Sequence, residues 1–251
     1  PERTRQADGA LAYDWGVERF LSGVTHTGEL ENIDNPRWWQ QEKEQTIRLQ
    51  QAVSRKSNRR SNRRKKAVRR LGAARAKVAR KRLDWAHQQT ALLASRYALV
   101  ATEELTLKNM TRSAVGTVEE PGKQVAQKAG LNREILDTAP GLFTSLFRYK
   151  VLETGGEWIH APTRKLKPSQ RCPRCWHVAK KQLSQRLHCC VQCWHQENRD
   201  AALSRAVLCW VLESIADHVL AETGCNYSRS TPSFATQRVA SFLKLAPCPG
   251  S

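Results

Sequence analysis

The chain has 251 residues, enough for a sizeable core, and its 42 lysines and arginines outnumber 23 acidic residues to give a net charge of +19. A soluble protein with so much like charge is expected to bind a polyanion, and nucleic acid is the most common one. The sequence shows no run of eighteen apolar residues and no leader-like start, so we expect a cytoplasmic protein rather than a membrane or exported one.

The first predicted element is a strand that ends in an acid. Apolar residues at 10–13 run directly into Asp14, and the pattern over 20–25 with the turn at 27–29 predicts a second strand and a hairpin. An aspartate after a strand more often forms a turn or caps a helix than acts in catalysis. Asp14 by its position alone therefore carries little functional weight.

Residues 38–95 consist mostly of helix formers and predict a helical hairpin. Serine–asparagine pairs place the bend between Arg55 and Arg64, because both residue types favour turns. An apolar stripe with spacings of three and seven residues is expected to dock the second helix. The stripe consists of Val68, Leu71, Val78 and Trp85.

Between Arg55 and Arg82 the hairpin carries fifteen lysines and arginines and no acid. A run of charge is usually only a solvated face, but this many uncompensated cations repel one another unless phosphates neutralise them. We therefore expect salt-sensitive binding of nucleic acid here. The predicted nucleic-acid-binding residues are Arg59, Arg60, Arg63, Arg64, Lys65, Lys66, Arg69, Arg70, Lys77, Arg80 and Lys81.

The apolar run at 97–102 is too short for a stable helix and predicts a buried strand that delivers Glu103 or Glu104. Paired glutamates at a strand end are more often solvated than catalytic. Farther along, the sequence predicts a loop over 122–129, a helix around 135–146 and a strand within 151–160.

Two Cys-x-x-Cys pairs predict a zinc ribbon over 169–196, because tetrahedral zinc takes four thiolates and each pair can grip the metal from a tight turn. The pairs are Cys172 with Cys175 and Cys190 with Cys193. The fourteen intervening residues suit a short hairpin that returns the second pair to the first. Free cysteines at metal spacing fit a reducing compartment better than a disulfide framework does.

Three alternatives remain open at the ribbon. Cys189 is adjacent to Cys190 and could replace it as a ligand, His177, His188 and His195 are weaker candidates, and scattered cysteines can simply be buried. A closed site of four thiolates leaves no position for a substrate, so a zinc ion bound there is expected to be structural.

After the ribbon, Asp200 stands at the start of an apolar-rich helix predicted over 201–220. An acid at a helix N-terminus interacts favourably with the helix dipole, which is sufficient reason for its presence without any catalysis. The tail over 223–251 is rich in serine, proline and threonine, and we expect it to be disordered.

The order of several short motifs resembles that of the TnpB or OrfB family, transposon-encoded RNA-guided endonucleases with a C-terminal zinc ribbon. The match covers roughly four-fifths of the chain, and no single motif is decisive. Besides the basic segment through Arg82, the motifs are YDWG (13–16), ATEELTLKNM (101–110), GLNR (130–133), YK (149–150), SQRCPRC (169–175) and ENRD (197–200).

This resemblance implies an α/β fold of the RNase H-like, RuvC type, with a mixed sheet, a basic helical insert and an inserted four-cysteine ribbon. It also implies that Asp14, Glu103 and Asp200 form a catalytic triad that holds magnesium for the cleavage of DNA, with guide RNA as a further partner. Glu103 rather than Glu104 matches the family's acid. Carboxylates crowded together need cations between them, and their hard oxygens suit magnesium.

The resemblance also sets expectations for boundaries. The nuclease core is expected over 9–168 with its helical insert at 38–95, the ribbon over 169–196 and the last nuclease segment over 197–222. The chain begins with Pro1 rather than methionine, and nothing before it matches the family's N-terminal recognition region, so we expect a chain truncated at its N-terminus.

The chain departs from the family pattern at three positions, and two alternatives remain. Each Cys-x-x-Cys turn is called a knuckle below. Trp176 and Trp194 replace the glycines that usually follow the second cysteine of each knuckle, and Ala202 replaces an asparagine after the third acid. A catalytically silent DNA- or RNA-binding regulator on the same fold is the first alternative. A zinc-ribbon RNA-binding protein unrelated to any enzyme is the second, and it needs neither Asp14 nor Glu103.

Overall fold

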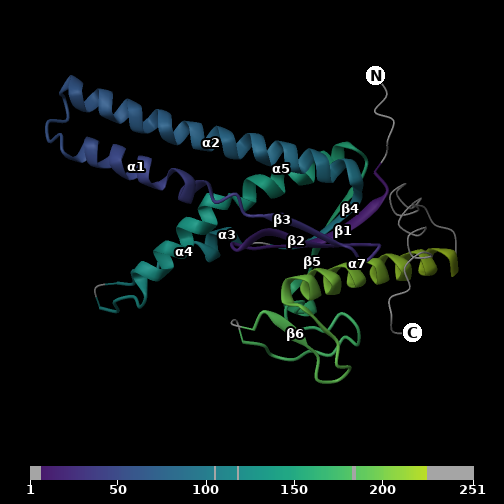
Figure 1. Ribbon diagram of the computed structural model, residues 1–251. Coiled ribbons are helices and arrows are strands. Elements are labelled where there is room, and N and C mark those ends of the chain that lie inside the picture. The colour runs from purple at the N-terminus through teal and green to yellow at the C-terminus, as the bar shows by residue number, and fades with distance from the viewer. Residues whose placement is uncertain (1–6, 105, 118, 183–184, 225–251) are drawn as a thin grey trace, which may run out of the picture. The chain divides into compact units, whose positions relative to one another are not determined.

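The computed structural model describes residues 7–104, 106–117, 119–182 and 185–224, and the predicted disordered tail lies almost wholly outside them (Figure 1). The chain forms two compact units. The first comprises residues 1–35, 91–106 and 147–251, and the second comprises residues 36–90 and 107–146. Among the described helices, none is both long and apolar enough to cross a membrane.

A five-stranded mixed sheet forms the centre of the first unit, in the order β3-β2-β1-β4-β5. The antiparallel strands are β1 (Gly9–Trp15), β2 (Arg19–Thr25) and β3 (Leu30–Asp34), and β4 (Tyr97–Glu103) and β5 (Glu157–Ala161) continue the sheet parallel to β1. Gly28, with φ of 87°, makes the predicted turn between β2 and β3 because glycine alone adopts that conformation without steric cost. The predicted first hairpin and the buried strand before Glu103 are both confirmed.

One face of this sheet packs on α7 (Arg199–Gly224), which lies alongside the strands in Figure 1. Side chains alternate between the two faces along a strand. Ala10 and Ala12 of β1 and Leu99 and Ala101 of β4 therefore share the face that is buried against α7. The helix contributes Ala201, Leu203, Val207, Leu208, Val211, Leu212 and Ile215 to this core.

Aromatic side chains cover the opposite face. The ring of Tyr13 lies 6.0 Å from that of Phe147 and 6.2 Å from that of Trp158. Phe147 and Trp158 meet edge to face at 5.3 Å. Such pairs add about 0.5–1.5 kcal/mol to the free energy that area burial supplies. Because both faces are covered, the strands are fixed in position at their ends as well as in their centres.

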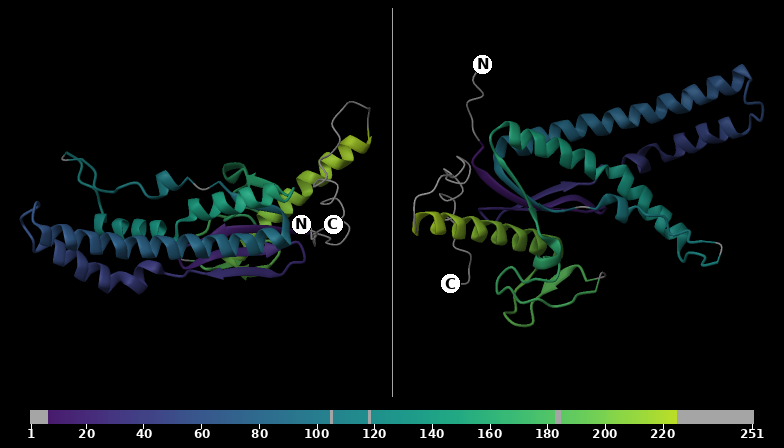
Figure 2. Two further views of the ribbon diagram at one scale, coloured as in Figure 1. Left: turned by 90° about the horizontal axis from the view of Figure 1, so that it is seen from above. Right: turned by 180° about the vertical axis from the view of Figure 1, so that it is seen from behind.

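The second unit contains the helical hairpin, made of α1 (Trp38–Ser54) and the part of α2 (Asn62–Arg96) up to residue 90. The two helices run antiparallel along each other in both views of Figure 2. The bend falls between residues 54 and 62, as predicted. Val68 is 44% exposed, and Ala67 is buried in its place, so the docked stripe of α2 is shifted by one residue at this end.

The base of the hairpin is held by Asp137 of α4 (Val125–Thr138). Its carboxylate accepts hydrogen bonds from the Arg82 guanidinium at 2.6 Å and from the backbone N–H of Trp39 at 2.7 Å. Trp85 packs between the rings of Trp38 and Phe143, at 6.4 and 6.0 Å. A buried ion pair combined with aromatic packing fixes α1, α2 and α4 relative to one another.

Two boundaries differ from the sequence prediction. The predicted loop over 122–129 is already helical from Val125, and the predicted strand over 151–160 starts only at Glu157 because α5 (Pro140–Glu153) continues through its first residues. The single helix expected around 135–146 is two helices, α4 and α5, which meet at Ala139 in the left-handed conformation (φ 49°).

The ribbon follows α6 (Thr163–Leu166) and contains two short antiparallel strands, β6 (Leu187–Cys189) and β7 (Gln196–Asn198). These strands flank the second cysteine pair. The described pairing therefore places this pair at the end of a hairpin, whereas the sequence predicted a hairpin between the two pairs. The chain continues from β7 directly into α7, so the ribbon is tied to the N-terminus of that helix.

Candidate functional site

Two of the predicted acids come from neighbouring parallel strands. Tyr13 of β1 is paired with Thr102 of β4, so the next residues, Asp14 and Glu103, are also neighbours across the pair. Alternation along each strand places Asp14 on the face of Ala12 and Glu103 on the face of Ala101, the face that packs on α7. Both acids thus extend beyond the apolar core at the same edge of the sheet.

The third acid, Asp200, lies in the first turn of α7. The side chain of Asn198 accepts the backbone N–H of Asp200 at 3.0 Å, which fixes the helix start. One turn later, the buried hydroxyl of Ser204 donates to the backbone carbonyl of Ser22 at 2.7 Å. Since Ser22 is paired with Asp14 across β1 and β2, this bond holds the start of the helix beside that acid.

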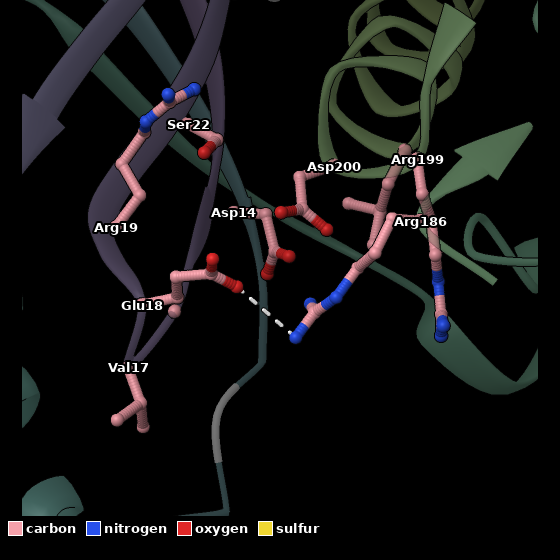
Figure 3. A pocket seen from close by; sticks show the side chains of 10 residues that line it. Asp14, Val17, Glu18, Arg19, Ser22, Arg186, Arg199 and Asp200 are labelled. Carbon is pink, nitrogen blue, oxygen red and sulfur yellow. Dashed lines mark ion pairs between the residues drawn. The ribbon is translucent and has the colours of Figure 1, made fainter. Parts of the chain in front are cut away.

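Asp14 and Asp200 line a common cavity of about 290 Å³. Their carboxylates lie beside one another in Figure 3, Asp14 on the strand and Asp200 on the helix. The other lining residues are Gly16, Val17, Glu18, Arg19, Ser22, Arg186, Arg199 and Leu203. Glu103 is not among the lining residues, although its charge acts on Asp14. The name acidic pocket is used below for this cavity together with Glu103.

Electrostatics show how closely the three acids interact. Burial, and then the charges of Glu103 and Asp200, raise the pKa of Asp14 from 3.8 to about 8. The backbone N–H of Trp15 and the charge of Arg199 oppose this shift. Burial also raises the pKa of Glu103. The metal-free pocket therefore favours a protonated Asp14, which is the expected result when carboxylates converge without a cation between them.

Glu104 lies in a different environment. It follows the end of β4, it is exposed, and its charge raises the pKa of His160, whose ring packs against Trp158 on the aromatic face. Burial is the main influence on His160 and lowers its pKa overall. No influence of Glu104 on Asp14 is among the causes of the raised pKa, whereas Glu103 is the second of them.

Two arginines of the acidic pocket were not singled out by the sequence. Arg186 reaches it from the ribbon, and its guanidinium lies 3.1 Å from the Glu18 carboxylate, as the dashed line in Figure 3 marks. Arg199 precedes Asp200, and its positive charge lowers the pKa of Asp14. Arg199 belongs to the ENRD motif and was readable as a candidate. Nothing in the local sequence around Arg186 points to a site 172 positions earlier in the chain.

The four predicted ribbon cysteines gather with all their sulfur atoms within 4.8 Å of one another, and they are the only such group of potential ligands among the described residues. The sulfurs of Cys172 and Cys193 are 3.6 Å apart, and those of Cys175 and Cys190 are 3.5 Å apart. A tetrahedron with metal–sulfur bonds of about 2.3 Å has edges of about 3.8 Å. This thiolate cluster is compatible with a metal such as zinc.

The structure separates the neighbouring candidates from the thiolate cluster. Cys189 is exposed and outside the cluster, while Cys190 is buried within it. His188 is buried at 1% exposure and contacts the amino group of Lys181 through its Nδ1 atom, and His195 contacts Glu197 at 3.3 Å. The sequence left open whether Cys189 or Cys190 joins the cluster, and the structure places Cys190 there.

Both knuckles have the same backbone geometry although tryptophan replaces glycine in each. The backbone N–H of Trp176 donates a hydrogen bond to the carbonyl oxygen of Cys172 at 3.0 Å. The backbone N–H of Trp194 donates one to the carbonyl oxygen of Cys190 at 3.1 Å. The two tryptophans have φ of 60° and 59°, which costs residues other than glycine about 1–2 kcal/mol. The knuckles are thus formed and tryptophan is tolerated at this cost.

Backbone N–H groups in the second knuckle also act on its buried sulfur. Burial raises the pKa of Cys190, but the backbone N–H groups of Cys193 and Gln192, together with the sulfurs of Cys175 and Cys193, lower it, and the pKa falls to about 6 overall. Burial, and then hydrogen bonds with the other three sulfurs, raise the pKa of Cys175. The four thiols therefore share their protons as one group, and a metal would need all of them as thiolates.

The predicted nucleic-acid-binding residues all lie on the turn of the hairpin or on α2. Each of them is exposed except Arg64, which is half-buried. Lys81 contacts Glu42 of α1 at 3.1 Å, and within the described ranges this is the only ion pair that a member of the set makes with an acidic side chain. The hairpin therefore presents an extended cationic surface with little internal neutralisation.

Comparison with protein families gives two matches. Residues 1–114 match a family described as a probable transposase, OrfB of the IS605 type. Residues 141–205, which include the ribbon and Asp200, match a Cas12f1-like TNB domain.

Two curated relatives have related names. A putative RNA-guided DNA endonuclease, InsQ of Escherichia coli (strain K12), is 35% identical over 173 residues, which are 68% of this chain and 42% of the relative. A putative RNA-guided DNA endonuclease of Streptomyces pristinaespiralis is 27% identical over 194 residues, which are 77% of this chain and 44% of the relative. The chain spans less than half the length of either relative.

Solved structures with the same fold include a CRISPR-Cas12f ternary complex, with a TM-score of 0.56 and 17% identity over 83% of this chain and 40% of that one. A Cas12f1–sgRNA–target DNA complex has a TM-score of 0.53 at 15% identity with the same coverage. At such low identity the likeness bears on the fold, and it is consistent with the RNase H-like sheet described above.

Proposed function

This chain belongs to the OrfB or TnpB family of transposon-encoded proteins, and we propose that it carries the nuclease centre of an endonuclease that cleaves DNA phosphodiester bonds with divalent metal ions. The convergence of three acids from distant segments is the observation that carries this proposal. Asp14 and Glu103 lie at one edge of the sheet, Asp200 lies in the first turn of α7, and the charges of Glu103 and Asp200 both act on Asp14. A helix cap or a turn residue would not require that convergence.

The donor set suits magnesium. Carboxylate oxygens are the hard ligands that this ion prefers, and burial together with mutual repulsion gives the acids a strong gain in free energy when a cation arrives. Asp14 and Asp200 would hold the metal from the two sides of the pocket, with Glu103 beside Asp14. Bound divalent ions would supply water activation and stabilisation of the leaving 3′ oxygen.

Arg186 and Arg199 would bind the phosphates of the strand that enters the acidic pocket. Both line it, and guanidinium groups bind phosphate oxygens in pairs. Glu18 holds Arg186 in the present structure through a largely exposed ion pair. Exposed pairs contribute little, about 0–1 kcal/mol, so a phosphate can displace Glu18 at low cost.

The thiolate cluster would hold a structural zinc ion. All four tetrahedral positions are filled by protein sulfur, so its role is to hold the ribbon and thereby Arg186 and the start of α7. Metal binding contributes folding free energy on the order of 10 kcal/mol in small zinc domains. The ribbon thus couples zinc to the geometry of the acidic pocket without exposing zinc to substrate.

Guide RNA and target DNA are the partners we propose for the full-length protein. The two relatives are named putative RNA-guided DNA endonucleases, and one of the Cas12f structures is a complex with sgRNA and target DNA. In this chain the cationic surface of the hairpin is suited to the phosphate backbone of either polymer.

The test is cleavage of labelled single- and double-stranded DNA by the purified chain in Mg²⁺ and Mn²⁺, together with calorimetric metal binding. Asp14→Asn is expected to abolish cleavage and to weaken metal binding, while nucleic-acid binding persists. Glu103→Gln should act in the same direction, and Glu104→Gln is the matched control that should retain activity.

Two outcomes would contradict this assignment. If Glu104→Gln loses as much activity as Glu103→Gln, the second acid has been assigned incorrectly. A wild-type chain that binds DNA but cleaves it with neither metal would favour the silent regulator instead.

A further inference from the structure

The turn end of the helical hairpin contains a further cavity, of about 280 Å³, in which cations gather. Its lining residues are three apolar side chains and four cations, Leu49, Ala52, Ala67, Lys56, Arg63, Lys66 and Arg70. None of the lining residues is acidic. The volume is close to the lower limit of ordinary ligand pockets, about 300 Å³, which suits a group the size of one sugar and its phosphate. The name hairpin pocket is used for this cavity.

Helical periodicity explains why the cations converge. Arg63, Lys66 and Arg70 are spaced by three and four residues, so they lie on one side of α2. Between them, Ala67 is buried at 9% exposure, and its small side chain leaves room beside α1. A helix side that meets a neighbouring helix is normally apolar. Here Ala67 is the buried residue, and the three exposed cations flank it.

The fourth cation, Lys56, lies in the turn that follows α1. The amino group of Lys56 donates to the carbonyl oxygen of Ala52 at 2.7 Å, and that bond holds the lysine at the pocket. Lys56 is half-buried. Because α2 begins at Asn62, its N-terminal turn adds partial positive charge close to Arg63. Four cationic side chains thus line one cavity close to the N-terminus of α2.

No acid neutralises this group. From residue 45 to residue 83 the chain contains neither aspartate nor glutamate. The described ion pairs of α2 lie eleven or more residues beyond Arg70, and they join Lys81 to Glu42, Arg82 to Asp137 and Arg96 to Glu31. Among the residues that the structure describes, no carboxylate pairs with a cation of the hairpin pocket. Four like charges around one cavity repel one another until an anion enters.

We propose that the hairpin pocket binds a backbone phosphate of a nucleic-acid strand, with the adjoining sugar against Leu49, Ala52 and Ala67. The inference rests on the nucleic-acid part of the proposed function, and it assigns one defined seat within a broad cationic surface. The seat is distinct from the acidic pocket in its chemistry, because it holds the strand and contributes no group to cleavage. The other cations of α2 act as a diffuse field around it.

Two double variants distinguish binding of phosphate in the hairpin pocket from binding by the overall positive charge of α2. Arg63→Gln with Lys66→Gln removes two charges from the hairpin pocket, and Lys65→Gln with Arg69→Gln removes two exposed charges that do not line it. Both are made in an Asp14→Asn chain, so that cleavage does not disturb binding. Fluorescence anisotropy with a labelled single strand is measured across a salt series.

We expect the pocket pair to weaken binding by about tenfold or more and to lower the salt slope by about 0.7, the value for one phosphate on a single strand. The control pair should weaken binding by less than about threefold. Equal losses in both pairs would overturn the proposal, since net charge alone would then account for affinity.

A third variant blocks the hairpin pocket without altering charge. Ala67→Leu fills the space between Arg63, Lys66 and Arg70, and circular dichroism checks that the helix remains. A defined seat predicts weaker binding, by about the same factor as the pocket pair, and unchanged affinity would count against it. Repulsion in the empty pocket further predicts that the pocket pair melts at a higher temperature than the parent chain.

Comparing different anionic polymers identifies the class of molecule that the hairpin pocket binds. Single-stranded DNA and RNA of one sequence are compared with poly-glutamate, which is anionic but has no phosphate. Equal sensitivity of DNA and RNA binding to Ala67→Leu indicates that the shared phosphate is recognised, while sensitivity with one polymer alone identifies that polymer as the occupant. Stronger binding of poly-glutamate than of either polymer would indicate an acidic protein and overturn the proposal.

The outcomes also separate this inference from the proposed function. If all variants bind equally well, the hairpin pocket fails while the nuclease proposal stands. If none of the chains binds nucleic acid, the nucleic-acid part of the proposed function fails as well.

Discussion

The thiolate cluster and the acidic pocket differ in how their residues are brought together. The cysteines lie within 22 residues of one another, and each pair is held by hydrogen bonds of its own knuckle. Asp14, Glu103 and Asp200 come from two strands and a helix spread over 187 residues. Their positions depend on strand register and on the packing of α7 against the sheet.

The difference teaches that a cluster of cysteines can be built locally, whereas the convergence of the three carboxylates depends on the whole unit. Neutral thiols can approach one another without a metal, and their sulfurs are 3.5 and 3.6 Å apart in two contacts. Carboxylates cannot approach so closely without repulsion, and Asp14 responds with a pKa near 8. Each of the following changes tests one side of this contrast.

The largest effect is expected at the thiolate cluster. Cys172→Ser removes one of four ligands, and the ribbon should lose its metal and most of the folding free energy that it supplies, on the order of 10 kcal/mol in small zinc domains. Bound zinc measured by mass spectrometry and thermal unfolding check this. Cys189→Ser is the matched control, because Cys189 is exposed outside the cluster and should leave both readings unchanged.

The next effect is a dependence of stability on pH that originates at Asp14. Its pKa is raised from 3.8 to about 8 in the folded chain, so between about pH 4 and pH 8 the folded chain keeps a proton that the unfolded chain releases. The metal-free protein should therefore lose stability as pH rises through this window. Thermal melts at pH 5.5 and pH 8 measure the loss.

Asp14→Asn should flatten this dependence and stabilise the metal-free chain at pH 8 by about 1–3 kcal/mol, a value reduced from the full shift because Asp14 is only half-buried. Added Mg²⁺ should raise the melting temperature of the wild-type chain at pH 8 and not that of the variant. A wild-type chain whose stability is the same at both pH values would contradict the electrostatic account.

A third effect distinguishes the two knuckles. Trp194 is 81% exposed and gains no packing in return for its left-handed backbone, so Trp194→Gly should stabilise the ribbon by about 1–2 kcal/mol. Trp176 packs against the core, and the Arg171 guanidinium lies 5.5 Å from its ring. Trp176→Gly should therefore destabilise the ribbon, because the packing that it loses outweighs the backbone strain that it relieves.

Thermal or urea unfolding of the two glycine variants checks the contrast. Identical shifts would show that backbone strain alone determines the free energy at both positions.

The smallest effect is expected at the edge of the acidic pocket. Glu18→Gln breaks the ion pair with Arg186, whose partners are 68% and 76% exposed, so stability should change by less than about 1 kcal/mol. If Arg186 binds phosphate, releasing it should raise affinity for a DNA strand slightly, by up to about threefold, and more at low salt. Lower affinity in the variant would argue that Glu18 positions Arg186 for binding.

Local patterns in the sequence predicted much of the fold. Short apolar runs before Asp14 and Glu103 located β1 and β4, and serine–asparagine pairs located the bend of the hairpin. The errors fell where local signals conflict with neighbours. The start of β5 at Glu157 was missed because α5 extends to Glu153, and Val68 was assigned to a stripe that in fact passes through Ala67.

The sequence by itself determined the thiolate cluster and the charge of the hairpin, because ligand spacing and composition are local properties. Family motifs added three candidate acids, whose catalytic role remains a prediction. Only the tertiary structure decided that Cys190 rather than Cys189 joins the cluster, that Arg186 reaches the acidic pocket and that cations enclose the hairpin pocket. Strand register, helix packing and burial bring together residues distant in the chain, and no local pattern encodes those contacts.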